Sequence, residues 1–208
     1  MIKALLLIFD PIATWDSILR VRRSVAWIFS LYLLPLLLLP CLAEGYGMVH
    51  WGKSQSQYGH LKRFTVSEAV VVETAQFLLL VLVVFVGAKL LKAIGETFHG
   101  RHTFTQAITA VAYSMSPLFL FRLLDMFPAV SPWVSWTIGI LLSVAVLYHG
   151  VPRTMEPDPS HAFGLYVISA LLMILITGLV RYLSAFFLQG QFPVLQNFVS
   201  QLAGRLPF

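Results

Sequence analysis

The sequence predicts an all-α integral membrane protein with five transmembrane helices, and three observations carry that prediction. Hydrophobic residues make up 58% of the 208 residues, charged residues make up only 11%, and the mean hydropathy is +0.82. Five apolar runs approach the roughly 20 residues that a helix needs to cross a bilayer. The runs are continuous rather than alternating, which excludes a membrane β-barrel. A chain this poor in charge could not cover a soluble surface, so a soluble enzyme and a disordered protein are also excluded.

The expected spans follow directly from the apolar runs. They cover residues 24–42, 69–94, 107–127, 133–151 and 162–183. The longest connection, residues 43–68, is the only loop with room for structure of its own. We therefore expect an N-terminal cytoplasmic or interfacial segment at 1–23, a membrane domain at 24–183 and an outer-side tail at 184–208.

The N-terminal segment predicts a short amphipathic helix lying in the membrane interface. Asp10 can cap a helix that starts at Pro11, because proline suits the first helical position. Apolar residues then recur at helical spacing, at Ile12, Trp15, Ile18 and Leu19. Residues 2–9 are too short for a signal peptide core and lack a small-residue cleavage site. The alternative is an extension of the first span, but the Arg22-Arg23 pair favours a break.

Lysines and arginines in the short loops predict the orientation. One side receives eight of them, at Lys3, Arg20, Arg22, Arg23, Lys89, Lys92, Arg101 and Arg153. The other receives five, at Lys53, Lys62, Arg63, Arg181 and Arg205. We expect the first side to be cytoplasmic, with the N-terminus inside and the C-terminus outside, in a bacterial inner membrane. Such bands explain the net charge of +5 without a nucleic-acid partner.

Two outer segments are expected to lie at the membrane surface. The loop predicts an aromatic anchor and a solvated hairpin, with a partner-docking role as the alternative, from His50, Trp51, Lys53, Tyr58, His60, Lys62 and Arg63. The tail predicts a helix with Pro193 in its first turn and apolar positions at Phe192, Val194, Leu195, Phe198, Val199 and Leu202. The tail is too interrupted to span, so we expect an interfacial helix or one that docks on a partner.

The order of these features resembles the Yip family of five-span membrane proteins. A proline and an aromatic residue precede the first span, at Pro11, Trp15 and Ile18. A glycine-rich polar turn leads into the third span, which then holds a tyrosine and a proline, at Gly95, Gly100, Thr103, Phe104, Tyr113, Ser114 and Pro117. A glycine closes the fourth span, at Gly150, Val151 and Pro152. The resemblance covers about residues 9–183 and implies the fold rather than a reaction.

Four charged residues at membrane depth form the candidate site, namely Glu73, Arg122, Asp125 and Arg181. All four are expected near the outer leaflet. Arg122 stays charged and therefore needs an anion. Asp125 lies one turn along the same helix, and Glu73 is taken as the only acid on another span at matching depth. We expect Arg122 to face the bundle and to pair with at least one of them, with Glu73 linking spans two and three.

Two interpretations of this cluster stay open. In the structural one, an ion-pair network orders three helices while Arg181 extends to the lipid headgroups. In the functional one, the cluster binds a lipid headgroup or passes a proton. Pro117 leaves the Tyr113 carbonyl without its helical partner and should kink the third span, with Ser114 and Ser116 satisfying the loosened turn. The kink is either a packing device or a hinge.

Other chemistry has little support in the sequence. The single cysteine, Cys41, excludes an internal disulfide. The possible metal ligands Glu96, His99 and His102 do not share one helical face, so we expect no metal site and no cofactor. Nucleophile elbows, phosphate loops and dinucleotide fingerprints are absent from the sequence.

The sequence therefore predicts a non-enzymatic protein that acts in membrane organisation or as an accessory subunit of a membrane complex. Its expected partners are the lipid bilayer and other membrane proteins or a second copy of itself. The alternative is a transporter or lipid-handling protein that uses polar groups of spans two and three. An intramembrane enzyme is a third class, without a sequence feature in its favour.

Overall fold

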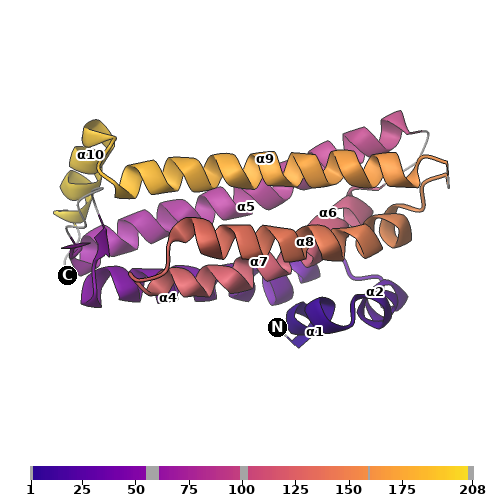
Figure 1. Cartoon of the computed structure of the whole chain (residues 1–208), viewed down its shortest axis with the longest axis horizontal. Helices are drawn as coiled ribbons and strands as arrows, with labels where there is room; N and C mark the ends of the chain where they lie inside the picture. Colours follow the sequence, from indigo (N-terminus) through magenta and orange to yellow (C-terminus); the bar gives the residue numbers. More distant parts are fainter. Residues whose placement is uncertain (1, 55–60, 99–102, 159, 206–208) are drawn as a thin grey trace.

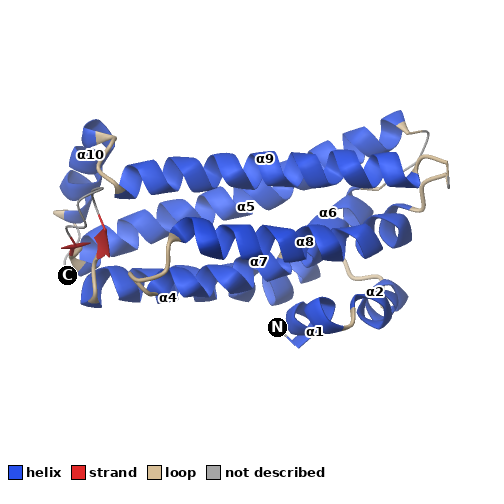
Figure 2. Ribbon diagram, viewed as in Figure 1, coloured by secondary structure: helices blue, strands red, loops and turns tan. Residues whose placement is uncertain are grey.

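Five helical stretches among the described residues are long and apolar enough to cross a membrane, as the sequence predicts. The computed structural model describes residues 2–54, 61–98, 103–158 and 160–205. The stretches are Val25–His50, Val66–Thr97, Phe104–Met126, Pro132–Met155 and Ala162–Leu188. They run along the long axis of the molecule as one bundle (Figure 1). Figure 2 shows that almost all of the described chain is helical.

The first span extends further than expected. It consists of α3 (Val25–Trp27), the π-helix η1 (Ile28–Leu33) and α4 (Leu34–His50). The expected end at residue 42 is therefore wrong, and Glu44 lies inside the helix. Because Leu37, Cys41, Glu44 and Met48 share one buried face, the acid turns into the bundle rather than out to water.

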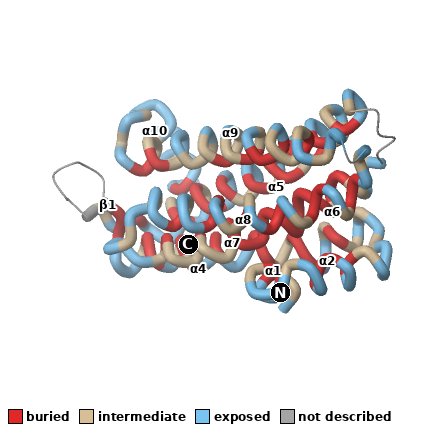
Figure 3. The backbone as a smooth tube through the Cα atoms, turned by 45° about the vertical axis from the view of Figure 1, so that its right-hand side comes forward, coloured by how far each residue is buried: buried red, intermediate tan, exposed pale blue. Residues whose placement is uncertain are grey.

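The third span is the most buried and is not one continuous helix. It consists of α6 (Phe104–Ser114), α7 (Ser116–Phe121) and the 3₁₀ helix η2 (Arg122–Met126). Seventy-two per cent of its most apolar window is buried, against 28% for the fifth span. Figure 3 shows this buried segment running through the middle of the bundle. It follows that groups on the third span contact helices on several sides.

The second, fourth and fifth spans are long single helices. They are α5 (Val66–Thr97), α8 (Pro132–Met155) and α9 (Ala162–Leu188). The start of α5 is fixed by a capping box in which Thr65 accepts from the Glu68 amide and Glu68 accepts from the Thr65 amide. The helices α5 and α8 pack against the third span, α9 packs on α5 and α8, and all three expose large apolar side chains.

The N-terminal segment forms two short helices beside the bundle, α1 (Ile2–Phe9) and α2 (Pro11–Arg20). The predicted start at Asp10 and Pro11 is confirmed, because the Asp10 side chain accepts from the Ala13 amide. A break separates α2 from the first span, as expected. The helix α1 was not expected.

Trp15 links α2 to α8 through a hydrogen bond and close packing. Its ring nitrogen donates to the Val146 carbonyl at 3.2 Å. A Cβ on Gly150 would lie 2.8 Å from Cε2 of the indole, so only glycine allows this approach. The Trp15 ring also meets Tyr113 edge-on, with centroids 6.1 Å apart. Residues that carried the family resemblance therefore come together at one packing point.

The opposite end of the bundle, which the charge bias predicts to be outside, carries a small hairpin and the C-terminal helix. Strand β1 (Lys53–Ser54) pairs antiparallel with β2 (Leu61–Lys62). The expectation that the hairpin is solvated is wrong for Lys53, because this residue is only 6% exposed. Tyr58 and His60 lie outside the described residues. The predicted tail helix is confirmed as α10 (Pro193–Ala203), with Pro193 in its first turn.

Candidate functional site

Glu44 lies at the centre of a buried charge network, in the half of the bundle that carries the hairpin and α10. Its carboxylate binds a cation on each oxygen. Oε2 accepts from Arg122 Nη2 at 3.0 Å and from Arg122 Nε at 3.3 Å, whereas Oε1 accepts from Lys53 Nζ at 3.1 Å. The glutamate is only 1% exposed, so water screens these interactions little.

Lys53 reaches the network because the chain reverses directly after α4. Gly52 adopts φ +82°, a conformation that costs a glycine little, and its amide donates to the Gly47 carbonyl at 3.1 Å. The reversal aims Lys53 back into the bundle, where Nζ also donates to the Asp125 carbonyl. The hairpin is thus tied to η2 as well as to α4.

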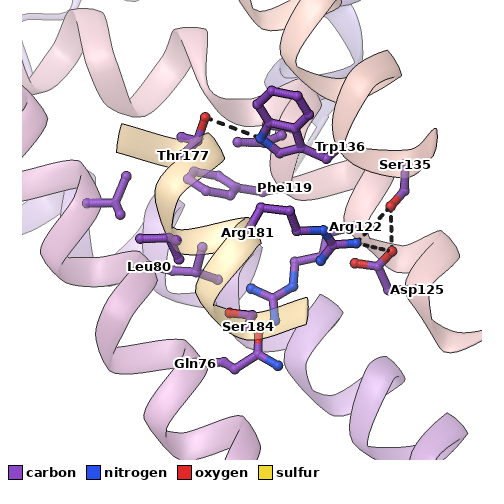
Figure 4. A pocket seen from close by; sticks show the side chains of 13 residues that line it. Gln76, Leu80, Phe119, Arg122, Asp125, Ser135, Trp136, Thr177, Arg181 and Ser184 are labelled. Carbon is purple, nitrogen blue, oxygen red and sulfur yellow. Dashed lines mark hydrogen bonds and ion pairs between the residues drawn. The ribbon is translucent and has the colours of Figure 1, made fainter. Parts of the chain in front are cut away.

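Asp125 and Arg181 form the second half of the network. Arg181 Nη2 lies 2.8 Å from Asp125 Oδ1, and Arg181 Nε donates to the Pro132 carbonyl at 3.0 Å. Ser135 donates to the same Asp125 oxygen and accepts from Arg181 at 3.2 Å. Figure 4 shows Arg181 reaching Asp125 and Ser135 across the space between α9 and α8. This arrangement joins η2, α8 and α9.

The polar side chains of α5 complete the site. Gln76 accepts from Arg122 Nη2, which also lies 3.9 Å from Glu73 Oε2. Glu73 is 8% exposed, and no N–H or O–H of the described residues donates to either of its oxygens. Arg122 therefore touches both α4 and α5, but its hydrogen-bonded carboxylate is Glu44.

The expected pairing is partly different from the observed one. Arg122 faces the bundle, and Glu73 is within 4 Å of it, as expected. The sequence predicts that Arg122 pairs with at least one of Glu73 and Asp125, and the Glu73 contact meets that prediction. Asp125 pairs with Arg181 of α9 instead of Arg122. Arg181 is bound inside the protein rather than extended to the headgroups. Glu44 corrects the expectation that Glu73 is the only matching acid.

The predicted break in the third span is present at Met115, between α6 and α7. Pro117 stands in the first turn of α7, and the freed Leu118 amide donates to the Ser143 hydroxyl at 3.1 Å. Ser116 donates to the Ala112 carbonyl at 3.2 Å, as expected of it. Tyr113 stacks on Tyr32, with centroids 4.2 Å apart. Whether the break moves as a hinge stays a prediction.

No metal-binding group of three histidines, cysteines or acids occurs in the described part of the chain. Glu96 pairs with Lys92 at 3.3 Å. His99 and His102 lie outside the described residues. A small cavity of about 40 Å³ adjoins the network between Gln76, Asp125 and Arg181, with room for a few water molecules.

Fold and site together define a class: a five-span helical membrane protein whose buried ion pairs and hydrogen bonds join all five spans at one end. A family model described as the Yip1 domain matches residues 5–181. The chain therefore belongs to the Yip1 domain family, as the sequence resemblance implied. Neither the curated proteins nor the solved structures contain a match to it.

Proposed function

We propose that this Yip1-family protein is not an enzyme and acts through contacts, in membrane organisation or as an accessory subunit of a membrane complex. The observation that supports this most is the mutual neutralisation of the buried charges. Three acids, Glu44, Glu73 and Asp125, face three bases, Lys53, Arg122 and Arg181. Five of these six charges are paired with one another at 3.1 Å or less, and Glu73 lies 3.9 Å from Arg122, so the network holds the helices together.

The distribution of the buried charges supports the same proposal. Within the described ranges, every buried charged side chain belongs to the outer-end network. A proton or ion path across the bilayer would need polar groups through the inner half as well. Around Tyr113 that half is instead packed with aromatic and aliphatic side chains and a few hydroxyls, such as those of Ser114 and Ser116, and the described residues place no buried charge there.

The surface of α9 offers room for a partner. It is the least buried span, and its exposed leucines form a ridge one helical turn apart at Leu171, Leu175 and Leu179. Such a ridge suits acyl chains or a helix of another membrane protein.

The test extracts the protein with its native lipid and measures its assembly by native mass spectrometry. We expect a stable complex that Leu175→Trp weakens and that Leu141→Trp, at an exposed position of α8, leaves intact. We also expect reconstituted vesicles to show no ion or lipid flux above protein-free vesicles. A monomer that is indifferent to partners and to lipid composition would contradict the proposal.

A lipid-handling role is the second candidate, and one observation favours it. A groove of about 560 Å³ lies between α4 and α5, with Leu38, Phe77 and Glu73 in its lining. An acyl chain fits the apolar wall, and a hydroxyl or ammonium donor fits the carboxylate. This role predicts that Glu73→Gln abolishes lipid transfer between vesicles while the unfolding midpoint is kept. Transfer at the wild-type rate in that variant would rule it out.

A further inference from the structure

A pocket distinct from the small cavity and the α4–α5 groove lies at the opposite end of the bundle, away from the charge network. It is bounded by the α2–α3 connection, the start of α6 and the end of α8, and its volume is about 380 Å³. Ligand pockets in proteins have volumes of roughly 300–1,000 Å³. The contact function proposed above does not use this pocket.

The lining of this pocket is positively charged. Arg22, Arg23 and Arg153 line it, against one carboxylate, Glu156. Arg153 Nε is already paired with Asp16 at 3.4 Å. In the described part of the chain, no ion pair joins Arg22 or Arg23 to a carboxylate. Two guanidinium groups are therefore available to an anion.

The backbone at two points of the pocket wall is strained. Arg22 has φ +34° and Glu156 has φ +42°, and these are the two positive-φ residues other than glycine in the described chain. The left-handed conformation is unfavourable for a residue with a side chain, because Cβ comes too close to the following carbonyl oxygen. Strain of this kind persists where the surrounding structure holds it, and it often occurs at functional sites.

Tyr113 gives the pocket a polar group in its deep part. The side chain is 1% exposed and lines the pocket. Its ring is held by Tyr32 and Trp15, and its hydroxyl makes no hydrogen bond to another described residue. The hydroxyl oxygen is not one of the fully enclosed unpaired atoms, so it is open to the pocket and can donate to a ligand atom.

The surroundings place the pocket at headgroup depth. The Arg23 guanidinium lies 3.7 Å from the Trp27 ring centroid, and tryptophan is enriched at the membrane–water boundary. The pKa of Lys3 is below its ordinary value, because burial disfavours its charge and Arg23 repels it. The region is thus electropositive and lies where lipid phosphates are found.

We infer that this pocket binds a phosphate group, with Arg22 and Arg23 pairing its charge, Arg153 at the rim and the Tyr113 hydroxyl donating to a phosphate oxygen. Guanidinium groups match phosphate oxygens in charge and geometry. The phosphate is carried by an anionic lipid headgroup of the adjoining leaflet or by a small soluble phosphate, and the two sources share this chemistry.

The test measures binding of three probes to the purified full chain in neutral-lipid nanodiscs. The probes are dihexanoyl phosphatidic acid, inorganic phosphate and dihexanoylglycerol. Phosphatidic acid binding more tightly than inorganic phosphate supports the lipid source, whereas equal binding supports the soluble one. If neither binds more tightly than dihexanoylglycerol, the inference is wrong.

Variants decide whether the pocket is the binding site. Arg22→Gln and Arg23→Gln should each weaken binding by about tenfold or more, since a hydrogen bond to a charged group contributes that much. Tyr113→Phe keeps the ring packing and should also weaken it. Arg20→Gln makes the same charge change at an exposed position outside the pocket and should leave binding unchanged. Equal losses in Arg20→Gln and Arg22→Gln would overturn the assignment.

Discussion

Replacing Glu44 by glutamine should destabilise the protein strongly, although glutamine has nearly the same shape. The carboxylate binds Arg122 at 3.0 Å and Lys53 at 3.1 Å in a site that is 1% exposed. Removing one partner from a buried ion pair costs about 3–5 kcal/mol, because the remaining charge is left uncompensated. Since glutamine keeps an acceptor oxygen, we expect a loss of about 3 kcal/mol.

Thermal unfolding in nanodiscs, followed by tryptophan fluorescence, measures this loss. A loss of about 3 kcal/mol corresponds to a midpoint roughly 6–12 °C lower for a chain of this size. The matched control is Glu96→Gln, which breaks the exposed Lys92–Glu96 pair and should cost about 0.5 kcal/mol or less. If Glu44→Gln lowers the midpoint no more than this control, the network does not stabilise the bundle.

A double variant separates charge balance from packing. Adding Lys53→Met to Glu44→Gln restores the formal neutrality of the network. We expect the double variant to lose less stability than the two single variants together, by about 1 kcal/mol or more. Strict additivity would mean that Lys53 and Glu44 act independently, despite the 3.1 Å between them.

Three further substitutions test the packing. Gly150→Ala should lower stability by about 1–3 kcal/mol and free α2 from α8, because the new Cβ would overlap the Trp15 indole; limited proteolysis within α2 measures the release. Gly47→Ala should be at least as costly, since its Cβ would overlap the backbone carbonyl of Met126, which cannot rotate away; an unchanged unfolding midpoint would refute this close approach. Asp10→Ala removes the cap of α2 and should cost about 1 kcal/mol; faster hydrogen exchange at residues 11–14 with the bundle unchanged is the expected signature.

Hydropathy located the spans well but placed the end of the first one too early. The reason is visible at Glu44. A hydropathy window treats an acidic residue as the polar end of a span, whereas in the structure two cations pair with Glu44 inside the bundle. One of them, Lys53, follows Glu44 by nine positions and returns through a turn that no helical periodicity describes. The available signal was helical spacing, which places Glu44 on the same face as the apolar residues Cys41, three positions before it, and Met48, four positions after it.

The partners of Arg122 show a similar limit. Spacing of three residues places Arg122 and Asp125 on one face, in an α-helix and in the observed 3₁₀ helix alike. Their closest partners nevertheless come from other helices, Glu44 for Arg122 and Arg181 for Asp125. The break at Pro117 was readable from the sequence, because proline lacks the amide that a helix interior needs. After that break, the helices that the side chains of the third span contact depend on packing between segments that are distant in the sequence.

The class of protein, the five apolar spans, the start of α2 after Asp10 and the break near Pro117 could be predicted from the sequence. These follow from local chemistry: transfer of apolar side chains out of water, helix capping and the missing proline amide. The Yip family was implied by a resemblance in the order of motifs. The structure was needed to show that Glu44 pairs with Lys53 and Arg122, that Asp125 pairs with Arg181, and that Arg22 and Arg23 line one pocket with Tyr113. These pairings join residues that are far apart in the chain. The partner of a buried charge depends on how the helices pack, and the local sequence around the charge does not specify that packing.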